Sequence, residues 1–322
     1  MKVSVVMAVY NALPYLDQAL NSVLAQTCDD LEVIAVDDGS RDGSLEYLRN
    51  VSDRRLRVVA LPSRGGQGVA RNIGIELSSS EYVAFMDADD VSLPTRLEHQ
   101  MEYLNRNPDL GAAGTLVKYC TRMGRTGFAP PLPLDHNSIR ADLMAGRHAI
   151  VNATLMLRAG ILKDLGGYRI AEGGEDWDFL LRLTEATRVT NLNEILYLYR
   201  LNPQSTNLRQ AGLVHARIAH ACDCAQRRSV NRAETSFEEF AAKQNQRPFW
   251  NRWVDLLDQA AATHYRKSMA EILDHESVGY ARLLVASALS PRRLVQRGRR
   301  TLRSLFHPRE TRCPSGSVLE RR

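Results

Sequence analysis

The chain has 322 residues, of which 44% are hydrophobic and 25% are charged. These ordinary values exclude a wholly disordered, fibrous or multi-span membrane protein. Five cysteines are too few, and odd in number, for a disulfide framework, which favours a reducing compartment. At roughly 150 residues per domain, the length predicts two domains, or one α/β domain with an extension.

The charge is divided unevenly along the chain. The net charge is +5, but residues 211–322 hold 20 Lys and Arg against 11 Asp and Glu, so residues 1–210 are net negative. We therefore predict two parts with different roles, residues 1–210 and a basic extension at 211–322. No apolar run reaches the roughly 18 residues of a membrane-spanning helix, and no basic segment precedes the first apolar run. We expect a cytoplasmic protein.

The first 110 residues alternate short apolar runs with helical patterns. The run Val3–Val9 is almost continuously apolar, as expected for a strand that is buried on both faces. Such alternation predicts a mostly parallel sheet with helices on both faces. The predicted strands are 3–9, 31–36, 56–61 and 82–86, and the predicted helices are 14–26, 44–50, 68–77 and 94–107.

The second half has a looser pattern. It contains three further predicted strands, one predicted helix that opens on acidic residues, and a Pro- and Gly-rich segment at 123–135 that we expect to form a mobile loop. Residues from 211 onward read as helical. The predicted strands are 110–119, 152–157 and 195–200, and the predicted helix is 176–186.

Three acidic clusters fall at predicted strand or helix ends, where ligands bind in open α/β sheets. They are Asp37 and Asp38, then Asp87, Asp89 and Asp90, then Glu175 and Asp176. One such cluster usually reflects turn formation alone. The Asp87-x-Asp89 spacing could offer two carboxylates to one hard cation that is shared with a diphosphate.

A glycine-rich basic segment, 64–72, leads into a predicted helix. A helix start of this kind can bind an anion through its free N–H groups. The segment lacks the Gly-Lys-Ser/Thr of a Walker loop and the Gly-x-Gly-x-x-Gly of a dinucleotide-binding turn. The alternative is a flexible turn with solvated Arg64 and Arg71.

Several segments together resemble the family 2 glycosyltransferases. They are VSVVMAVYN at 3–11, SVLAQT at 22–27, VDDGSRDGS at 36–44, GVARN at 68–72, FMDADD at 85–90 and GEDWDFLLRL at 174–183. The resemblance covers roughly residues 1–205. It implies a GT-A fold, with a nucleotide-binding half at about 1–110 and an acceptor half at about 111–210. It also implies inverting transfer of a sugar from a nucleotide sugar.

The resemblance implies a role for particular residues of this sequence. Tyr10 matches the position that stacks on the base, and Asp38 the position that hydrogen-bonds it, usually uracil. Asp89 and Asp87 are the expected ligands of Mn²⁺ or Mg²⁺ on the diphosphate. The full set of nucleotide-binding residues is Ala8, Tyr10, Asp38, Gly68, Arg71, Asn72, Asp87 and Ala88.

Asp176 matches the general base of the family. A positioned carboxylate that takes the proton from an acceptor hydroxyl makes that oxygen a better nucleophile, and one base without a carboxylate nucleophile suits inversion. Glu175, Trp177 and His148 are candidate acceptor contacts, although a structural role is the simpler interpretation of Trp177 and His148.

One position departs from the family pattern. Many members read Tyr-Arg-x-His after the last strand, where this chain has Tyr199-Arg200-Leu201-Asn202. An Asn amide suits hard ions better than transition metals, so the metal preference is open. The expected donor is a UDP-sugar. A GDP- or dTDP-sugar is one alternative, because the base-contacting residues do not exclude it. An inactive sugar-nucleotide-binding scaffold, which Asn202 slightly supports, is the other.

The expected acceptor is a glycan or a lipid-linked oligosaccharide of the cell surface. The segment 291–306 mixes Arg with Leu, Val and Phe in a pattern that suits an amphipathic helix on an anionic membrane. A solvated tail or a helix packed on the catalytic part is the alternative. No nucleic-acid-reading module accompanies the charge, so no nucleic-acid partner is expected. We expect peripheral attachment to the inner face of the membrane.

Overall fold

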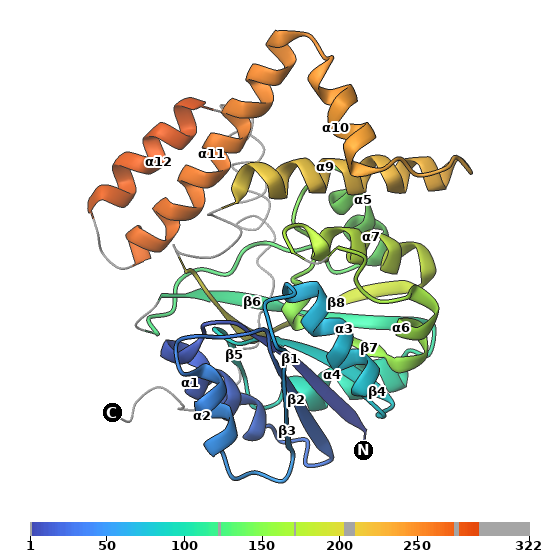
Figure 1. Ribbon diagram of the computed structural model, residues 1–322, viewed down its shortest axis with the longest axis vertical. Coiled ribbons are helices and arrows are strands. Elements are labelled where there is room, and N and C mark those ends of the chain that lie inside the picture. Colours follow the sequence, from blue (N-terminus) through green and yellow to red (C-terminus); the bar gives the residue numbers. More distant parts are fainter. Residues whose placement is uncertain (1, 122–123, 171, 203–209, 274–276, 290–322) are drawn as a thin grey trace.

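The computed structural model describes residues 2–121, 124–170, 172–202, 210–273 and 277–289. Its centre is an eight-stranded mixed sheet with the strand order β3-β2-β1-β4-β7-β6-β8-β5 (Figure 1). The strands are β1 (Val3–Val9), β2 (Leu31–Asp37), β3 (Leu56–Ala60), β4 (Tyr82–Asp87), β5 (Val91–Ser92), β6 (Leu110–Cys120), β7 (Met156–Arg158) and β8 (Arg188–Arg200).

The first four strands confirm the predicted parallel arrangement. β1 pairs in parallel with both β2 and β4, and β2 pairs in parallel with β3. The later strands make the sheet mixed, because β7 is antiparallel to β4 and β6, and β5 is antiparallel to β8. β6 and β8 run parallel, and the β4–β7 pairing joins the first four strands to the later ones in one sheet.

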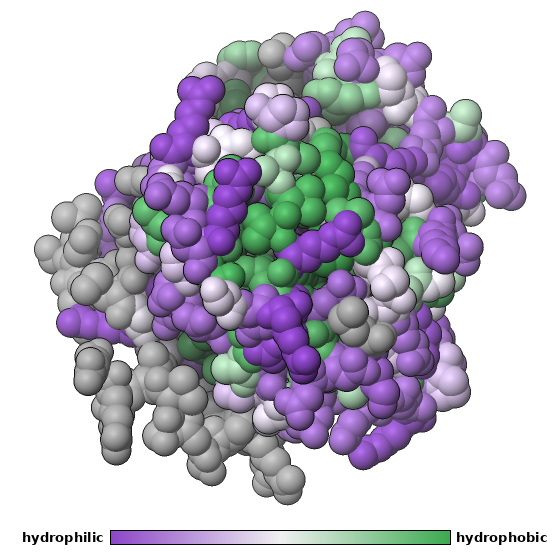
Figure 2. All heavy atoms as spheres, turned by 60° about the horizontal axis from the view of Figure 1, so that its bottom comes forward, coloured by the Kyte–Doolittle hydropathy of each residue, from purple (hydrophilic) through white to green (hydrophobic). Residues whose placement is uncertain are grey.

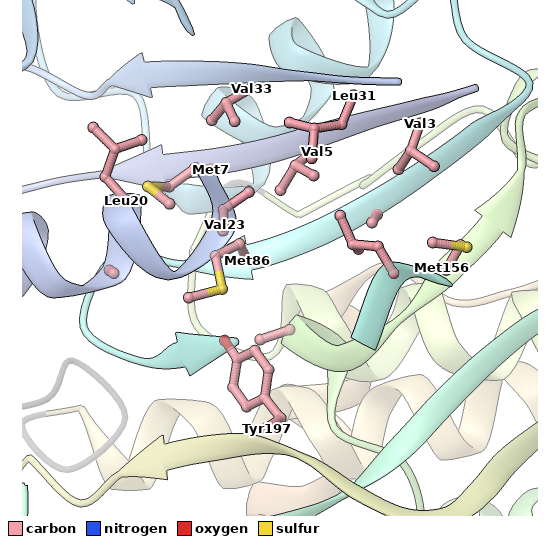
Figure 3. Packing of buried hydrophobic residues seen from close by; sticks show 14 of the residues in the cluster. Val3, Val5, Met7, Leu20, Val23, Leu31, Val33, Met86, Met156 and Tyr197 are labelled. Carbon is pink, nitrogen blue, oxygen red and sulfur yellow. The ribbon is translucent and has the colours of Figure 1, made fainter. Parts of the chain in front are cut away.

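Helices cover both faces of the sheet. On one face lie α1 (Leu13–Leu24), α2 (Ser44–Asn50) and α4 (Arg96–Arg106), which pack with alternate β1 residues such as Val5 and Met7 (Figure 3). On the other face lie α3 (Gln67–Leu77), α5 (His136–Met144), α6 (Ala159–Leu165) and α7 (Glu175–Ala186). The alternation of burial partners along β1 follows from the two-residue period of a strand.

The predicted helical character of the extension is confirmed where the structure describes it. It contains α9 (Ala211–Ser229), α10 (Phe237–Asn245), α11 (Phe249–Leu273) and α12 (Ser277–Leu289). α5 and α7 lie between the sheet and α9 (Figure 1). The face seen in Figure 2 is mostly polar, with one apolar area near the middle of the view.

Three expectations for the second half need correction. The strand expected at 152–157 begins only at Met156, because Asn152–Thr154 forms a 3₁₀ turn in which the Thr154 hydroxyl donates to the Val151 carbonyl at 2.7 Å. β8 begins at Arg188 rather than 195, because the Nδ2 of the buried Asn191 donates to the Pro133 and Ala149 carbonyls. Two helices, α5 and α6, were not predicted.

The described part of the segment expected to be a loop, 124–135, contains an isolated bridge from Thr126 to Cys120 and no helix. The predicted amphipathic segment 291–306 lies outside the described residues. Within the described part of the chain, no helix is both long and apolar enough to cross a membrane.

Candidate active site

The candidate residues gather where β1, β2 and β4 end. Ala8 of β1 pairs with Asp87 of β4, and Val9 pairs with Asp37 of β2. Because these strands are parallel, the Asp38 turn and the Asp87–Asp90 turn lie at the same edge of the sheet. The sequence prediction that both clusters lie at strand ends is therefore consistent with the topology.

Asp38 holds the glycine-rich loop in place. Its Oδ1 accepts from the Gly65 backbone N–H at 2.6 Å, and its Oδ2 accepts from the Gly66 N–H at 2.9 Å. Gly66 has a φ of +98°, a conformation that L side chains rarely adopt. These two hydrogen bonds, which no sequence motif indicated, fix the entry to α3 and bring Arg64 toward β1.

Arg64 lies over the ring of Tyr10, with 4.2 Å between the guanidinium carbon and the ring centroid. Tyr10 is 39% exposed, so its ring is available at the surface of the site. Arg64 also forms an ion pair with Glu172, which precedes α7. Arg64 thus links the glycine-rich loop beside Tyr10 directly to the segment that leads to Asp176.

Arg71 is a buried, charged side chain between the Asp87–Asp90 turn and the Glu175–Asp176 cluster. Its Nη2 donates to Oδ1 of Asp87 at 2.8 Å, and its Nη1 lies 3.5 Å from Oε1 of Glu175. Its guanidinium carbon is 5.4 Å from the Tyr168 ring centroid. Arg71 is 3% exposed, so these carboxylates supply its compensating charge.

Asn72, in contrast, is committed to the backbone of Tyr168. Its Nδ2 donates to the Tyr168 carbonyl and its Oδ1 accepts from the Tyr168 N–H, both at 2.8 Å. The remaining nucleotide-binding predictions are small residues in buried positions: Gly68 begins the buried face of α3, and Ala8 and Ala88 pack in the core.

The Asp87–Asp90 turn carries two carboxyl groups with altered acidity. Burial, followed by the neighbouring Asp87 charge, raises the pKa of Asp89 to about 6, although a hydrogen bond from Asn202 opposes the change. Burial and the Asp89 charge raise the pKa of Asp90 well above its ordinary value. The turn therefore gathers carboxyl groups in a poorly solvated place that disfavours the charged forms of Asp89 and Asp90, and a bound cation would favour those charged forms.

Arg200 holds this turn to the end of β8. Its backbone N–H donates to Oδ1 of Asp90 at 2.7 Å, and its Nε donates to the Asp89 carbonyl at 2.6 Å. Its Nη1 reaches the Thr121 carbonyl at 2.8 Å at the end of β6. Arg200 is one of the residues whose importance sequence reasoning missed; its place in the Tyr-Arg-x-His-like segment was the available signal.

The oxygen donors present fit a hard divalent cation. Asp87 is partly exposed, Asp89 lies beside it, and the Asn202 amide contacts Asp89. Mg²⁺ and Mn²⁺ accept such oxygens and complete their shells with water and phosphate. Among the described residues, no group of three or more His, Cys, Asp or Glu is arranged to hold a metal ion by itself. A site completed by a diphosphate is compatible with this arrangement.

The third acidic cluster opens α7. Asp176 is half-buried in the first turn of the helix, and its Oδ1 accepts from the Trp177 N–H at 2.9 Å. Burial, followed by the Asp176 charge, raises the pKa of Glu175 to about 7, and Arg71 opposes the rise. Glu175 thus lies between the predicted base and the arginine that contacts Asp87.

The structure places Trp177 in the core. It is 2% exposed, and its Nε1 donates to the Leu143 carbonyl of α5 at 3.2 Å. His148 is exposed and meets the Trp177 ring edge-on, with 5.0 Å between the ring centroids. A role in acceptor binding for either residue stays a prediction.

The model of the glycosyl transferase family 2 matches residues 4–166, about half of the chain. The chain belongs to this family. It is an enzyme of the glycosyltransferase class, and family 2 members carry out nucleotide-sugar transfer in polysaccharide biosynthesis. An uncharacterized glycosyltransferase of Haemophilus influenzae is 32% identical over 217 residues, which cover 64% of this chain and 67% of that protein. The O-antigen biosynthesis glycosyltransferase WbnJ of Escherichia coli is 31% identical over 63% of this chain and 81% of its own.

Solved structures confirm the expected GT-A fold. Residues 1–349 of S. aureus TarS, in complex with UDP-GlcNAc, align with a TM-score of 0.60 at 16% identity, over 97% of this chain and 93% of that chain. The mannosyltransferase PcManGT of Pyrobaculum calidifontis, in complex with GDP-Man and Mn²⁺, aligns with a TM-score of 0.53 at 18% identity, over 95% and 81%.

Proposed function

We propose that this family 2 glycosyltransferase is inverting, that its donor is a UDP-sugar, and that Asp176 is its general base. The observation that carries the proposal is the Arg71 bridge, which ties Asp87 at the end of β4 to Glu175, the neighbour of Asp176. Arg71 therefore fixes the position of Asp87, which we assign to donor binding, relative to the start of α7, which carries Asp176. The acceptor is a hydroxyl of a surface glycan or a lipid-linked oligosaccharide.

In this mechanism the acceptor hydroxyl gives its proton to Asp176 as its oxygen forms a bond to the anomeric carbon. The bond from that carbon to the diphosphate oxygen breaks on the opposite side, so the configuration inverts. Asp87 and Asp89 would hold Mg²⁺ or Mn²⁺, which when bound would offset the negative charge of the departing diphosphate. Tyr10 offers a ring for base stacking once Arg64 moves from it. Asp38 lies at the same end of the sheet as Tyr10.

Calorimetry with UDP tests the donor part of the proposal. We expect binding that requires Mn²⁺ or Mg²⁺, is lost with a chelator, and is weakened by Asp89→Asn. Tight binding of GDP or dTDP with no binding of UDP would replace the donor assignment. Absence of binding for all three nucleotides would overturn it.

Asp176→Asn tests the base. This variant should bind UDP like the wild type and lose transfer by about 10²-fold or more, as expected for the loss of a general base. Transfer that survives the substitution would show that another group accepts the proton. A wild type that binds UDP but transfers no sugar to any acceptor extract would favour the scaffold alternative.

Attachment to the inner membrane face is the second part of the proposal. Besides the basic sequence of 291–306, α11 supports it, because Phe249, Trp250 and Trp253 are 59%, 74% and 49% exposed near its start. Exposed tryptophans are common at membrane–water interfaces. Sedimentation with vesicles should show binding to phosphatidylglycerol but not to phosphatidylcholine alone. Equal recovery in the supernatant with both vesicles would exclude it.

A further inference from the structure

Helix α9 of the extension lies directly against the turn that begins α7. Gly173 and Gly174 form this turn with φ values of +78° and +90°. A Cβ on Gly174 would come within 3.0 Å of the Arg217 Cβ, and one on Gly173 within 3.3 Å of Arg217 Nη1. The glycines are therefore needed for backbone conformation and for the close approach of α9.

Arg217 binds the carbonyl groups of this turn. Its Nη1 donates to the carbonyl of Glu172 and, at 3.2 Å, to that of Gly173. The same guanidinium lies over the Phe237 ring at 5.8 Å, so α10 holds it from the outer side. The side chain of Glu172 also pairs with Arg64 of the glycine-rich loop. Glu172 is therefore held on one side by that loop and on the other by α9.

The turn sets the position of the proposed base. The Gly174 carbonyl accepts from the Trp177 and Asp178 N–H groups at 3.2 and 3.4 Å, which makes it the first acceptor of α7. Asp176 lies within this first turn, so a shift of the Gly173–Gly174 backbone moves its carboxylate. A displacement of about 1 Å at a reacting group can cost about 10²-fold in rate.

The far end of α9 is also fixed to α7. Arg228 forms a bidentate pair with Glu185 near the end of α7, at 2.6 and 3.0 Å, and Ala221 and Ala225 pack in the core beside the α7 side chains. α9 therefore has a fixed position on α7, from which Arg217 can hold the turn. Both helices lie beyond residues 4–166, the part that matches the family model.

We propose that Arg217 is a positioning residue: by binding the Glu172 and Gly173 carbonyls it fixes the Gly173–Gly174 turn and thereby the Asp176 carboxylate. The first helix of the extension is then part of the catalytic unit. The catalytic consequence rests on the proposed function, with Asp176 as base, but the structural part does not.

The test compares Arg217→Ala and Arg217→Lys in the full-length protein with Arg227→Ala as a matched control. Arg227 lies on the same helix and pairs with Asp223 one turn away, so its loss leaves the α7 turn untouched. Hydrogen–deuterium exchange of the peptide covering 172–178 reads the turn itself. Arg217→Ala should raise its exchange rate about tenfold or more, Arg217→Lys less, and Arg227→Ala not at all.

Kinetics then read the consequence for the base. Arg217→Ala should lower kcat about 10- to 10²-fold with donor KM and UDP affinity within about twofold of wild type, and Arg217→Lys should restore part of kcat. Unchanged exchange at 172–178 overturns the proposal whatever the activity. A joint loss of melting temperature, UDP binding and kcat in Arg217→Ala also overturns it, because a folding role explains that result. Raised exchange with an unchanged kcat overturns the positioning role of Arg217, whereas transfer that survives in Asp176→Asn would refute the base itself.

Discussion

The guanidinium of Arg71 donates a 2.8 Å hydrogen bond to the carboxylate of Asp87, the first acidic residue of the Asp87–Asp90 turn. Its other terminal nitrogen faces Glu175, so a single buried side chain separates the proposed metal-binding end of the site from the proposed base. A change in the charge or the position of Asp87 is therefore transmitted to Glu175 through Arg71, and the reverse also holds. This coupling gives the first two predictions.

Arg71→Met should destabilise the protein and weaken metal-dependent UDP binding. It leaves the buried carboxylate of Glu175 and the half-buried one of Asp87 without their cation, a loss that costs about 3–5 kcal/mol for buried pairs. Urea unfolding measures the free energy change. Arg106→Met is the control, because its pair with Glu102 is solvent-exposed and its loss should change little. Equal stability of the two variants would contradict the bridging role.

The pH dependence of stability should reveal Glu175. Burial and the Asp176 charge raise its pKa from 4.5 to about 7, so the folded state binds this proton more tightly than the unfolded state. The resulting stabilisation is fully present below about pH 4.5 and is lost as the pH rises through about 7. Wild type should lose about 2–3 kcal/mol relative to Glu175→Gln between pH 5 and 8. Parallel stability curves for the two proteins would refute the raised pKa.

Sequence reasoning located much of the site, and physical features explain the remainder. The strand ends at Asp38 and Asp87 were predictable because β1, β2 and β4 are short, apolar and parallel, which fixes where their carboxyl ends lie. The contacts of Arg71, Arg200 and Arg217 were harder to predict, although Arg71 was among the predicted nucleotide-binding residues and Arg200 lay in the Tyr-Arg-x-His-like segment. Each arginine bonds to groups distant in the chain, such as Arg200 to the Asp89 carbonyl, and local patterns carry no trace of such contacts.

Residues 111–210 were harder to predict for a related reason. Their strands and turns contain buried polar residues, such as Asn152 and Asn191, that disrupt an apolar pattern but form hydrogen bonds with remote partners. The Asn152 Oδ1 accepts from the Tyr168 hydroxyl at 3.0 Å, and Tyr168 in turn packs against Phe85 and Phe179. Only the folded chain brings these groups together.

Asp178 should be a major source of stability in α7. Burial alone would raise its pKa, but hydrogen bonds and charge from Arg169 and Arg182 hold the pKa below its ordinary value. Asp178→Ala leaves the buried Arg182 uncompensated and should cost about 3–5 kcal/mol in urea unfolding at pH 7. The Asp178 contribution is present above about pH 3.8 and should disappear as the pH falls further.

The control for this variant is Asp109→Ala, which breaks an exposed pair with Arg188. Little change is expected there. If both alanine variants unfold at the same urea concentration, the network around Asp178 does not contribute as argued.

Asn202→His should change the metal preference of UDP binding. The Asn202 side chain hydrogen-bonds to Asp89 and stands where many family members have His. Imidazole favours transition metals over Mg²⁺. Titration calorimetry should show UDP binding tightened about fivefold with Mn²⁺ and unchanged with Mg²⁺. Equal changes with both ions would mean that residue 202 acts on Asp89 alone.

Gly174→Ala should impair catalysis more than its backbone strain explains. Both Gly174 and Gly146 have a positive φ, at +90° and +66°, so alanine is strained at either position by about 1 kcal/mol or more. A Cβ at Gly146 meets nothing within 4 Å, whereas one at Gly174 lies 3.0 Å from the Arg217 Cβ. The difference between the two variants therefore isolates the contact between α9 and the turn.

We expect Gly146→Ala to lower the melting temperature slightly and keep kcat within about twofold of wild type, because the added Cβ meets nothing within 4 Å. Gly174→Ala should reduce kcat about tenfold or more, since the turn must move away from α9 and carries Asp176 with it. Steady-state kinetics with saturating donor separate the two. An equal kcat in both variants would show that the fit of α9 against Gly174 does not set the position of the base.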